Sequence, residues 1–580
     1  MSTKSDRYLL VAALDFGTTY SGYAYALRGD FKTEPLKIQA NQAWNSGSSQ
    51  HWSLKTPTCL LLDKNKEFKS FGYDAENTYS DLVLDEEQSN YYFFNRFKMK
   101  LHKNKHLSSE LILEDVTGKS VSAINVFALS IKALVDHLLE LLEKRGTGMS
   151  RDDVRWVLTL PAIWTDSAKQ FMRKAANKAG IPDKNLFIAL EPEAASIYCQ
   201  YLPTEKLHGA ETGFHMSSAG TRYMIVDLGG GTADITLHEK LPDGQLKEIC
   251  RADGNDCGGT SVDNAFFQLF VKIVGAPLMN TMKLKEPGAY LDIFRAFENV
   301  KRTIDTTTTG KVNVTFPFAT FDSLCQKHLS ESFDSALASS KYKGDIIRRG
   351  DKIRFEVDLM KSLFAPTIDG IISLVKSVLE KREARKTSLI IMVGGFSECR
   401  LIQAGLRKQF PKHRIIVPEQ ADLAVLKGAV LFGQKPSAIQ SRVIKTTYGV
   451  AMTAKFDPTK HDQKHKSVIA GVEKTRNLFD VIMKENSSVP VGTKITKSYS
   501  TTMEKQNEIK LSVYTTNNAY PKYVDEKGCY LLGEIVMAIE DPSDEKRWFD
   551  IEFEFGKTEV SAVAMDKKSR QLCKATFNIK

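Results

Sequence analysis

Two short segments of the chain combine a carboxylate, glycines and hydroxyl groups, and each directly follows an apolar run. They are Asp15-Phe-Gly-Thr-Thr and Asp227-Leu-Gly-Gly-Gly-Thr-Ala-Asp. Glycine lets a backbone approach a phosphate closely, and successive N–H groups can then cradle its oxygens. An aspartate at such a turn can hold Mg²⁺, directly or through water, beside the phosphates. Because two such hairpins can grip phosphates from opposite sides, Asp15–Thr19 and Asp227–Thr232 predict a Mg²⁺-nucleotide site.

The elements around these hairpins alternate between strands and helices. The apolar runs before Asp15 and Asp227 are short and bounded by glycine, which suits strands buried on both faces. A third strand–glycine pattern is Ser388-Leu-Ile-Ile-Met-Val-Gly-Gly-Phe-Ser. Apolar residues recur at helical spacing over 127–138, and 166–179 is rich in helix formers. The alternation predicts an α/β architecture, and the repeated hairpin predicts two similar lobes facing a cleft.

The pattern of apolar and polar residues changes from about Thr446 onward. Glu508–Tyr514 and Phe549–Phe555 alternate apolar and polar residues and are separated by turn residues. Strands of period two predict an antiparallel β-sandwich with one wet face. We expect Gln434–Ser441 to be the linker. The sequence reaches Lys580 directly after a final strand, so we expect no helical lid.

Length and composition narrow the class of protein. With 580 residues the chain is too long for one core, and 42% hydrophobic with 26% charged residues is an ordinary globular mixture. The net charge of +10 arises from 80 basic and 70 acidic residues. The basic residues are concentrated locally at Arg96–His106 and Lys460–Lys466. No aromatic interleaving or nucleic-acid fold signature accompanies these charges. We therefore expect a solvated basic surface and no nucleic-acid partner.

The cysteine pattern and the apolar runs predict a cytoplasmic protein. None of the eight cysteines forms a Cys-x-x-Cys pair, and sparse spacing suits reduced thiols. No signal-peptide core precedes the first strand, and the longest apolar runs, Leu9–Leu14 and Leu389–Val393, are far shorter than a membrane span. We expect a soluble monomer with no transmembrane segment.

The two hairpins resemble the phosphate motifs of the 70-kDa heat-shock (DnaK-type) chaperone family. The resemblance covers about 8–435 with high specificity and about 446–580 more loosely. Lacking a lid and an acidic tail, the chain resembles the divergent heat shock 70 kDa protein 12 branch of that family. The further segments that carry the likeness, in family order, are Thr56-Pro57-Thr58, Leu158-Thr-Leu-Pro-Ala-Ile-Trp-Thr-Asp-Ser, Glu191-Pro-Glu-Ala-Ala, Gly258-Gly259 with Asp263, Gly394-Gly395 and Ala421-Asp-Leu-Ala-Val-Leu-Lys-Gly-Ala.

The resemblance implies a fold and its ligands. The α/β part would be a duplicated actin/heat-shock-type (ribonuclease H-like) ATPase domain over 1–438. Lobe I would span about 8–218, lobe II about 219–410, and the chain would return to lobe I over about 411–435. A β-sandwich over 439–580 would bind a client peptide or partner protein. The family also implies ATP or ADP, Mg²⁺, a monovalent cation such as K⁺, and a nucleotide-exchange factor.

Residue roles follow from the same resemblance. Lys98, Asp234, Glu191 and Thr232 would be catalytic, although Arg96 and Lys100 compete with Lys98 because the local spacing is altered. Asp15, Asp227 and Glu191 would order the water shell of Mg²⁺. The residues implied to contact nucleotide are Asp15, Gly17, Thr18, Thr19, Tyr20, Asp227, Gly229, Gly230, Gly231, Thr232, Gly258, Gly259, Glu298, Lys301, Arg302, Gly394, Gly395 and Asp422.

Several positions depart from the family pattern. Asp305 falls where the family has a serine that contacts the base, and Glu398 falls where it has an arginine that stacks on adenine. Arg400 is the nearby cation that could replace that arginine. The linker is polar and basic instead of leucine-rich and acidic, and 322–351 looks like an insertion that enlarges one lobe.

Two functions remain open from the sequence. One is a slow, chaperone-like ATPase whose nucleotide state is coupled to peptide binding. The other is a non-hydrolysing adaptor that binds ATP as a conformational ligand and recruits a partner through its β domain. A sugar or acetate kinase and an actin-like filament share the duplicated cleft, but neither gives a reason for the β-sandwich.

Overall fold

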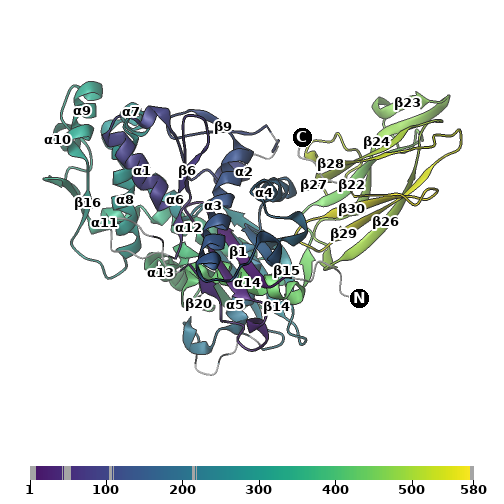
Figure 1. Cartoon of the computed structure of the whole chain (residues 1–580). Helices are drawn as coiled ribbons and strands as arrows, with labels where there is room; N and C mark the ends of the chain where they lie inside the picture. The colour runs from purple at the N-terminus through teal and green to yellow at the C-terminus, as the bar shows by residue number, and fades with distance from the viewer. Residues whose placement is uncertain are drawn as a thin grey trace.

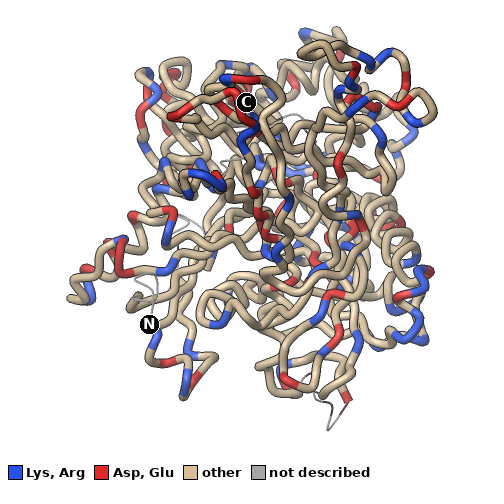
Figure 2. The backbone as a smooth tube through the Cα atoms, turned by 90° about the vertical axis from the view of Figure 1, so that its right-hand side faces the viewer, with Lys and Arg blue, Asp and Glu red and all other residues tan. Residues whose placement is uncertain are grey.

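The computed structural model describes residues 8–41, 44, 54–103, 107–108, 110–211, 214, 216 and 218–574. Strands and helices of the first three quarters of the chain form one large body, and the last strands extend from one side of it (Figure 1). Residues 104–106 of the predicted basic run lie outside the described residues. Lysine and arginine are interspersed with aspartate and glutamate along the chain (Figure 2).

The first central sheet is built around the strand that precedes the first hairpin. β1 (Leu10–Phe16) is buried along its whole length. It runs antiparallel to β2 (Tyr20–Leu27) and parallel to β10 (Val154–Leu160). The strand order is β11-β10-β1-β2-β3, with β4 also paired to β2. The remaining strands of this sheet are β3 (Gln39–Ala40), β4 (Thr56–Pro57) and β11 (Leu186–Leu190).

The second central sheet repeats this arrangement around the second hairpin. β13 (Arg222–Leu228) runs antiparallel to β14 (Ala233–Lys240) and parallel to β19 (Leu389–Val393), which ends at the third glycine motif. The order is β12-β20-β19-β13-β14-β15-β21-β25. The predicted repetition of the α/β unit is therefore confirmed. The other strands are β12 (Leu207–His208), β15 (Leu246–Asn255), β20 (Arg414–Pro418), β21 (Ile439–Val443) and β25 (Ser488–Pro490).

Two helices connect the sheets. α5 (Glu191–Tyr201) and α14 (Ala424–Gln434) share a buried apolar cluster with β1, β13 and β19. They cross so closely that a Cβ on Gly428 would collide with the carbonyl oxygen of Ala194. Only glycine permits this approach, so α5 and α14 pack backbone to backbone at this crossing.

Further helices and small sheets build the outer parts of the two lobes. The predicted insertion contributes Phe333 and Ile346 to the apolar cluster of the second lobe, which enlarges that lobe. The helices are α1 (Tyr73–Leu84), α2 (Met99–Lys103), α3 (Ala123–Lys144), α4 (Asp166–Lys178), α6 (Gly259–Val274), α7 (Ala276–Lys285), α8 (Pro287–Thr303), α9 (Phe318–Leu329), α10 (Phe333–Ser339), α11 (Val357–Ser362), α12 (Ala365–Leu379) and α13 (Arg400–Gln409). The small strands are β5 (Cys59–Leu62), β6 (Phe68–Phe71), β7 (Tyr92–Asn95), β8 (Ile112–Glu114), β9 (Ser120–Ser122), β16 (Lys311–Thr315), β17 (Ile346–Arg349) and β18 (Lys352–Glu356).

One helical stretch, Val357–Leu379, is long and apolar enough to cross a membrane by length and composition alone. It consists of α11 and α12, which are separated by a two-residue turn. Ile371, Val375 and Val378 of α12 are buried in an apolar cluster with the second central sheet. A single stretch of this kind is weak evidence for a membrane span.

Most strands of the C-terminal region form two antiparallel sheets, whereas β25 pairs with β21 in the second central sheet. Ile551, Phe553 and Phe555, predicted to share one face of a strand, are buried in one apolar cluster with Ile509 and Leu511 of the other sheet. The first sheet has the order β23 (Lys466–Ile469), β24 (Val472–Met483), β22 (Thr447–Lys455), β27 (Glu508–Thr516) and β28 (Cys529–Ala538). The second has the order β26 (Thr493–Ser500), β29 (Trp548–Phe555), β30 (Ser561–Asp566) and β31 (Leu572–Lys574).

Part of the predicted linker is a strand. α14 ends at Gln434, and β21 begins at Ile439 and pairs in parallel with β15 at the edge of the second central sheet. The backbone N–H of Val443 donates to the Glu248 carboxylate at 2.8 Å. Although the segment is polar and basic, its backbone extends the sheet. The C-terminal region is thereby joined to the second lobe by backbone pairing as well as by the chain.

Candidate nucleotide site

A cavity of about 240 Å³ lies between the two hairpins and takes its walls from both central sheets. Almost all of the residues predicted from the sequence line it. They are Asp15, Gly17, Thr18, Thr19, Tyr20, Lys98, Glu191, Asp227, Gly229, Gly230, Gly231, Thr232, Gly259, Glu298, Lys301, Arg302, Gly394, Gly395 and Asp422. Segments separated by up to about four hundred residues of sequence thus meet at one place.

The glycines of the second hairpin form a cradle that side chains would fill. A Cβ on Gly231 would lie 2.6 Å from the hydroxyl of Thr18, and one on Gly230 would collide with Thr19 of the first hairpin. The hairpin is held to the start of α6 by the bond from Thr260 N–H to the Gly230 carbonyl, at 2.8 Å. Backbone and hydroxyl groups that meet this tightly suit phosphate oxygens, so the cradle fits the nucleotide that the hairpins predict.

Two predicted residues stand behind the cavity lining. Gly258 packs against the second hairpin, where a Cβ would lie 2.6 Å from the carbonyl oxygen of Gly230. Asp234 is 1% exposed and accepts a bond from the backbone N–H of Ile163 at 3.3 Å. It pairs directly with Asp227 across the hairpin. Gly258 therefore shapes the cradle, and Asp234 lies behind Asp227.

Buried carboxylates give the cavity an acidic floor. Burial raises the pKa of Asp227 well above its ordinary value, and the neighbouring charges of Glu191 and Asp234 raise it further. Burial likewise raises the pKa of Glu191 to about 7, against the opposing effect of Lys98. Among the described residues, no three acidic, histidine or cysteine side chains lie close enough to hold one ion directly. A cation between Asp15, Asp227 and Glu191 would fit this floor mainly through water.

The structure distinguishes among the three cations considered for the catalytic position. Lys98 is 3% exposed, and its ammonium lies 2.9 Å from Glu191 Oε1. It also lies over the ring of Trp164, 5.2 Å from the centroid. Arg96 instead pairs with Asp263 at 2.8 Å, and the Lys100 side chain is exposed. Lys98 is the one of the three that lines the cavity.

One lysine of the site escaped the sequence reasoning. Lys55 Nζ lies 2.6 Å from Asp15 Oδ2 and 2.8 Å from the carbonyl oxygen of Asp422. Burial alone would raise the pKa of Asp15, but the charges of Lys55 and Lys98 outweigh it and lower that pKa below its ordinary value. The signal in the sequence was its position immediately before Thr56-Pro57-Thr58, which carried part of the family resemblance.

The end of the cavity predicted to hold the purine contains paired charges. The guanidinium of Arg302 lies 5.0 Å from the centroid of the Tyr20 ring and pairs with Glu298 at 2.8 Å. Lys301 is buried and pairs with Asp263 at 2.8 Å. Arg302 therefore offers a flat cationic face to a base, whereas the Lys301 head points into the wall.

Of the two acidic residues that depart from the family pattern, one lines the cavity and the other does not. Glu398 lines the cavity and is partly buried, which raises its pKa. Asp305 caps the turn that follows α8, and the hydroxyls of Thr307 and Thr308 lower its pKa. Arg400 is 75% exposed and pairs with Asp305 at 3.3 Å, so it does not line the described cavity. Of the two acidic residues, Glu398 is thus the one that lines the cavity.

Replacing Glu398 with arginine is expected to tighten ADP binding about tenfold, because a cation over a purine face replaces an acid. Isothermal titration with ADP and Mg²⁺ measures the effect. Glu398→Gln is the matched control, since it removes the acid without adding a cation. Equal affinities for the arginine and glutamine variants would contradict the stacking explanation.

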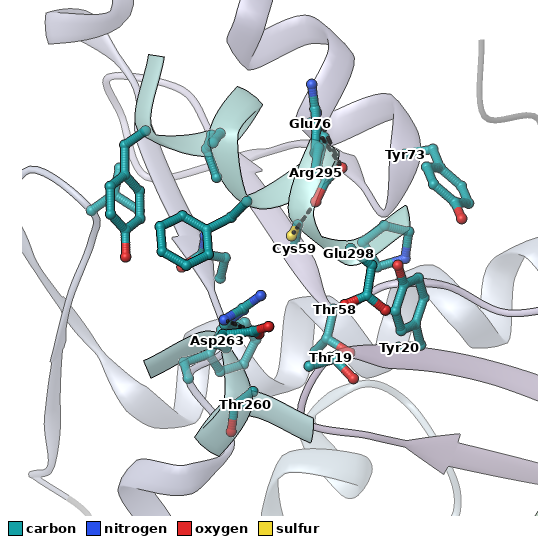
Figure 3. Close-up of a pocket in the computed structure, with 18 of the residues that line it drawn as sticks. Thr19, Tyr20, Thr58, Cys59, Tyr73, Glu76, Thr260, Asp263, Arg295 and Glu298 are labelled. Carbon is teal, nitrogen blue, oxygen red and sulfur yellow. Dashed lines mark hydrogen bonds and ion pairs between the residues drawn. The ribbon is translucent and has the colours of Figure 1, made fainter. Parts of the chain in front are cut away.

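A larger cavity of about 1240 Å³ adjoins this one and shares Thr19, Tyr20 and Glu298 with it (Figure 3). Arg295 of α8 reaches across to Glu76 of α1, and the two are 3.1 Å apart. A second bridge between the lobes joins Arg96 and Asp263. All four residues line the larger cavity, so these ion pairs join the two lobes there.

A duplicated α/β fold with two phosphate hairpins facing a common cleft defines an ATP-binding protein of the two-lobed, actin-like class. The model of the family described as "Hsp70 protein" matches residues 93–576. The chain belongs to the Hsp70 family.

The curated relatives agree with this assignment. The chain is 33% identical to "Heat shock 70 kDa protein 12A" of Homo sapiens, over 97% of this chain and 90% of that protein. It is 32% identical to "Heat shock 70 kDa protein 12B" of Homo sapiens, over 98% of this chain and 91% of that protein. A "Heat shock cognate HSP70 protein" of Trypanosoma brucei brucei is 24% identical, over 90% of this chain and 69% of that protein. Membership implies binding of nucleotide with Mg²⁺, and interactions with substrates and partners.

Proposed function

We propose that the protein is a slow, Mg²⁺-dependent ATPase that couples its nucleotide state to the binding of a peptide or partner protein by the C-terminal sheets. One observation carries the proposal: α5 contacts both the nucleotide cavity and β21, the strand that leads into the C-terminal sheets. Glu191, its first residue, receives Lys98 in the cavity, and Glu193 receives Arg442 of β21. Because both contacts belong to one rigid helix turn, a shift of α5 changes them together.

The contact between α5 and β21 is a buried, bidentate ion pair. Arg442 Nε and Nη2 each donate to one oxygen of Glu193 at 2.7 Å, and Nη1 donates to the carbonyl of Gly556 at 2.6 Å. Arg173 of α4 forms a second pair with Glu559, at 2.8 and 2.6 Å. The guanidinium of Arg442 thus links the α/β body to the loop before β30, which belongs to the C-terminal sheets.

The site has the groups that phosphoryl transfer needs. Lys98 supplies a cation that faces the cavity, where it would stabilise charge developing on the γ-phosphate. Thr232 and the glycine cradle would hold the phosphates in place. Mg²⁺, when bound, would neutralise charge on the phosphate oxygens. Asp234, behind Asp227, would orient that carboxylate or a nearby water.

Isothermal titration with ATP, ADP and GTP in the presence of Mg²⁺, followed by single-turnover hydrolysis, tests this function. We expect both adenine nucleotides to bind at sub-millimolar concentration and ATP to be hydrolysed slowly. If no adenine nucleotide binds in that range, the proposal fails. Binding without release of phosphate would instead support the non-hydrolysing adaptor.

We propose that the two C-terminal sheets, over 439–580, form the partner-binding β-sandwich, and that 1–438 forms the nucleotide-binding domain of a cytoplasmic monomer. β23 is an outer strand of the first sheet, and Val468 on it is 66% exposed. An extended peptide can add to such an edge by strand pairing.

The junction between the two regions is expected to be sensitive to pH through Glu248. Burial raises the pKa of Glu248 to about 7, with a further contribution from Glu193, against Lys445 and Arg442. Because the folded state holds this proton more tightly than the unfolded state, Glu248 contributes stability below about pH 4.5 that is lost as pH rises through about 7.

Glu248→Gln removes this titration. The variant should therefore gain stability relative to the natural protein between pH 5 and pH 8, on the order of 2 kcal/mol. Thermal unfolding of both proteins at the two pH values measures the gain. Glu552→Gln, at a partly exposed carboxylate paired with Lys494, is the control and should show no such trend. A gain that is the same at both pH values would disprove the role of Glu248.

A further inference from the structure

The two hairpins differ at one equivalent position. Across the second hairpin Asp227 pairs with Asp234, whereas across the first Asp15 pairs with Gly22. A Cβ on Gly22 would lie 3.0 Å from Cγ of Lys55. The absence of a side chain at Gly22 therefore leaves room for the stem of Lys55, which runs over it towards Asp15.

The backbone around Lys55 is held in place. β4, which starts at the next residue, pairs with β2 by placing Thr56 opposite Ser21. The N–H of Thr58 donates to the carbonyl of Thr19 in the first hairpin at 2.8 Å. The side chain of Lys55 is 15% exposed. Its ammonium group is thus a built feature of the cavity and not a mobile surface charge.

The ammonium group of Lys55 lines the same cavity as the two hairpins, where it would lie beside bound phosphates. It contacts Asp15, one of the carboxylates expected to order the metal's water shell, and the Asp422 carbonyl at 2.8 Å. A buried carboxylate without a partner is strongly unfavourable, and a lysine donor also serves phosphate oxygens as a point charge. Lys55, Lys98 and Lys301 all line a cavity that also holds Asp15, Glu191 and Asp227.

We propose that Lys55 is a resident cation of the nucleotide site, which neutralises Asp15 and contacts the phosphates so that the chain binds adenine nucleotides without a divalent ion. The inference rests on the proposed nucleotide-binding function and adds to it that binding and hydrolysis differ in their need for Mg²⁺. Binding would persist without the metal, whereas hydrolysis would still require it.

Equilibrium binding of ADP to the full chain, in excess EDTA and in Mg²⁺, tests the proposal. We expect the affinity of the natural protein in EDTA to lie within about tenfold of that in Mg²⁺. Lys55→Met should lose at least about thirtyfold in EDTA and less than threefold in Mg²⁺, because the metal then neutralises Asp15. The variant should also need less Mg²⁺ for half-maximal binding, since Lys55 no longer competes for that carboxylate.

Lys64→Met, at an exposed lysine in the turn after β5, is the matched control and should behave as the natural protein does. Lys55→Arg should retain most of the binding in EDTA. If the natural protein binds ADP in Mg²⁺ but loses more than about a hundredfold in EDTA, the role of Lys55 is disproved and the proposed function stands. This measurement requires no variant to fold. If ADP does not bind under either condition, the proposed function itself fails.

Discussion

Replacing Lys98 with methionine is expected to lower the single-turnover rate of ATP hydrolysis about 100-fold or more, while the affinity for ATP changes less than about tenfold. Removing one preorganised group that stabilises transition-state charge typically has an effect of this size. Lys98 is held by Glu191 at 2.9 Å and is almost fully buried, so its charge is fixed before the nucleotide arrives. Phosphate binding is shared with the hairpins, which explains why binding should survive.

Two further variants make the Lys98 result interpretable. Lys100→Met removes an exposed lysine two residues away and should leave the rate unchanged. Glu191→Gln, combined with Lys98→Met, relieves any buried charge that the single variant leaves without its partner. Rapid-quench measurement of phosphate release, with binding measured by titration, separates the two steps. An undiminished rate in Lys98→Met would assign catalysis to another group.

Replacing Arg442 with methionine is expected to destabilise the junction between the α/β body and the C-terminal sheets by about 3–5 kcal/mol. Removing one partner of a buried ion pair has a cost of this order, because the other charge stays buried without compensation. Arg442 is 8% exposed and Glu193 is 2% exposed at the side chain. The loss should weaken the pairing of β21 with β15, since Arg442 lies in β21.

Limited proteolysis near 435–445 and thermal unfolding measure this loss. The matched control is Arg173→Met, which breaks the pair with Glu559 at the same junction. Because that pair is partly exposed, its loss should cost only about 1 kcal/mol or less. Glu193→Met combined with Arg442→Met should recover part of the stability by removing both charges. A cost no larger than that of Arg173→Met would show that the buried pair does not hold the junction.

Around the junction, sequence patterns predicted some strands correctly and missed another. Period-two alternation correctly predicted the strands around Ile509 and Ile551, because alternation reports directly which face is buried. The same reasoning treated Gln434–Ser441 as a linker, because its residues are polar. β21 forms there nonetheless, since backbone pairing with β15 needs no apolar side chain and Arg442 is neutralised by Glu193. A charge partner 249 residues away leaves no mark in the local sequence.

In the cleft, too, the sequence did not predict the partners of individual side chains. The resemblance placed Lys98 among three competing cations, and only the fold separates their partners as Glu191, Asp263 and solvent. It assigned Asp234 a role in the cavity, whereas the described lining does not include it. The pattern at Glu398 showed that an expected cation is missing, and the structure adds that Arg400 points to Asp305 instead.

The sequence by itself determined the two phosphate hairpins at Asp15–Thr19 and Asp227–Thr232, because glycines and carboxylates after short apolar strands are local signals. It also determined the duplicated α/β order and the family. Only the tertiary structure decided which charges compensate one another, since Lys55 with Asp15, Lys98 with Glu191 and Arg442 with Glu193 are distant pairs. Electrostatic energy depends on separation and burial in space, and neither is encoded in the local pattern.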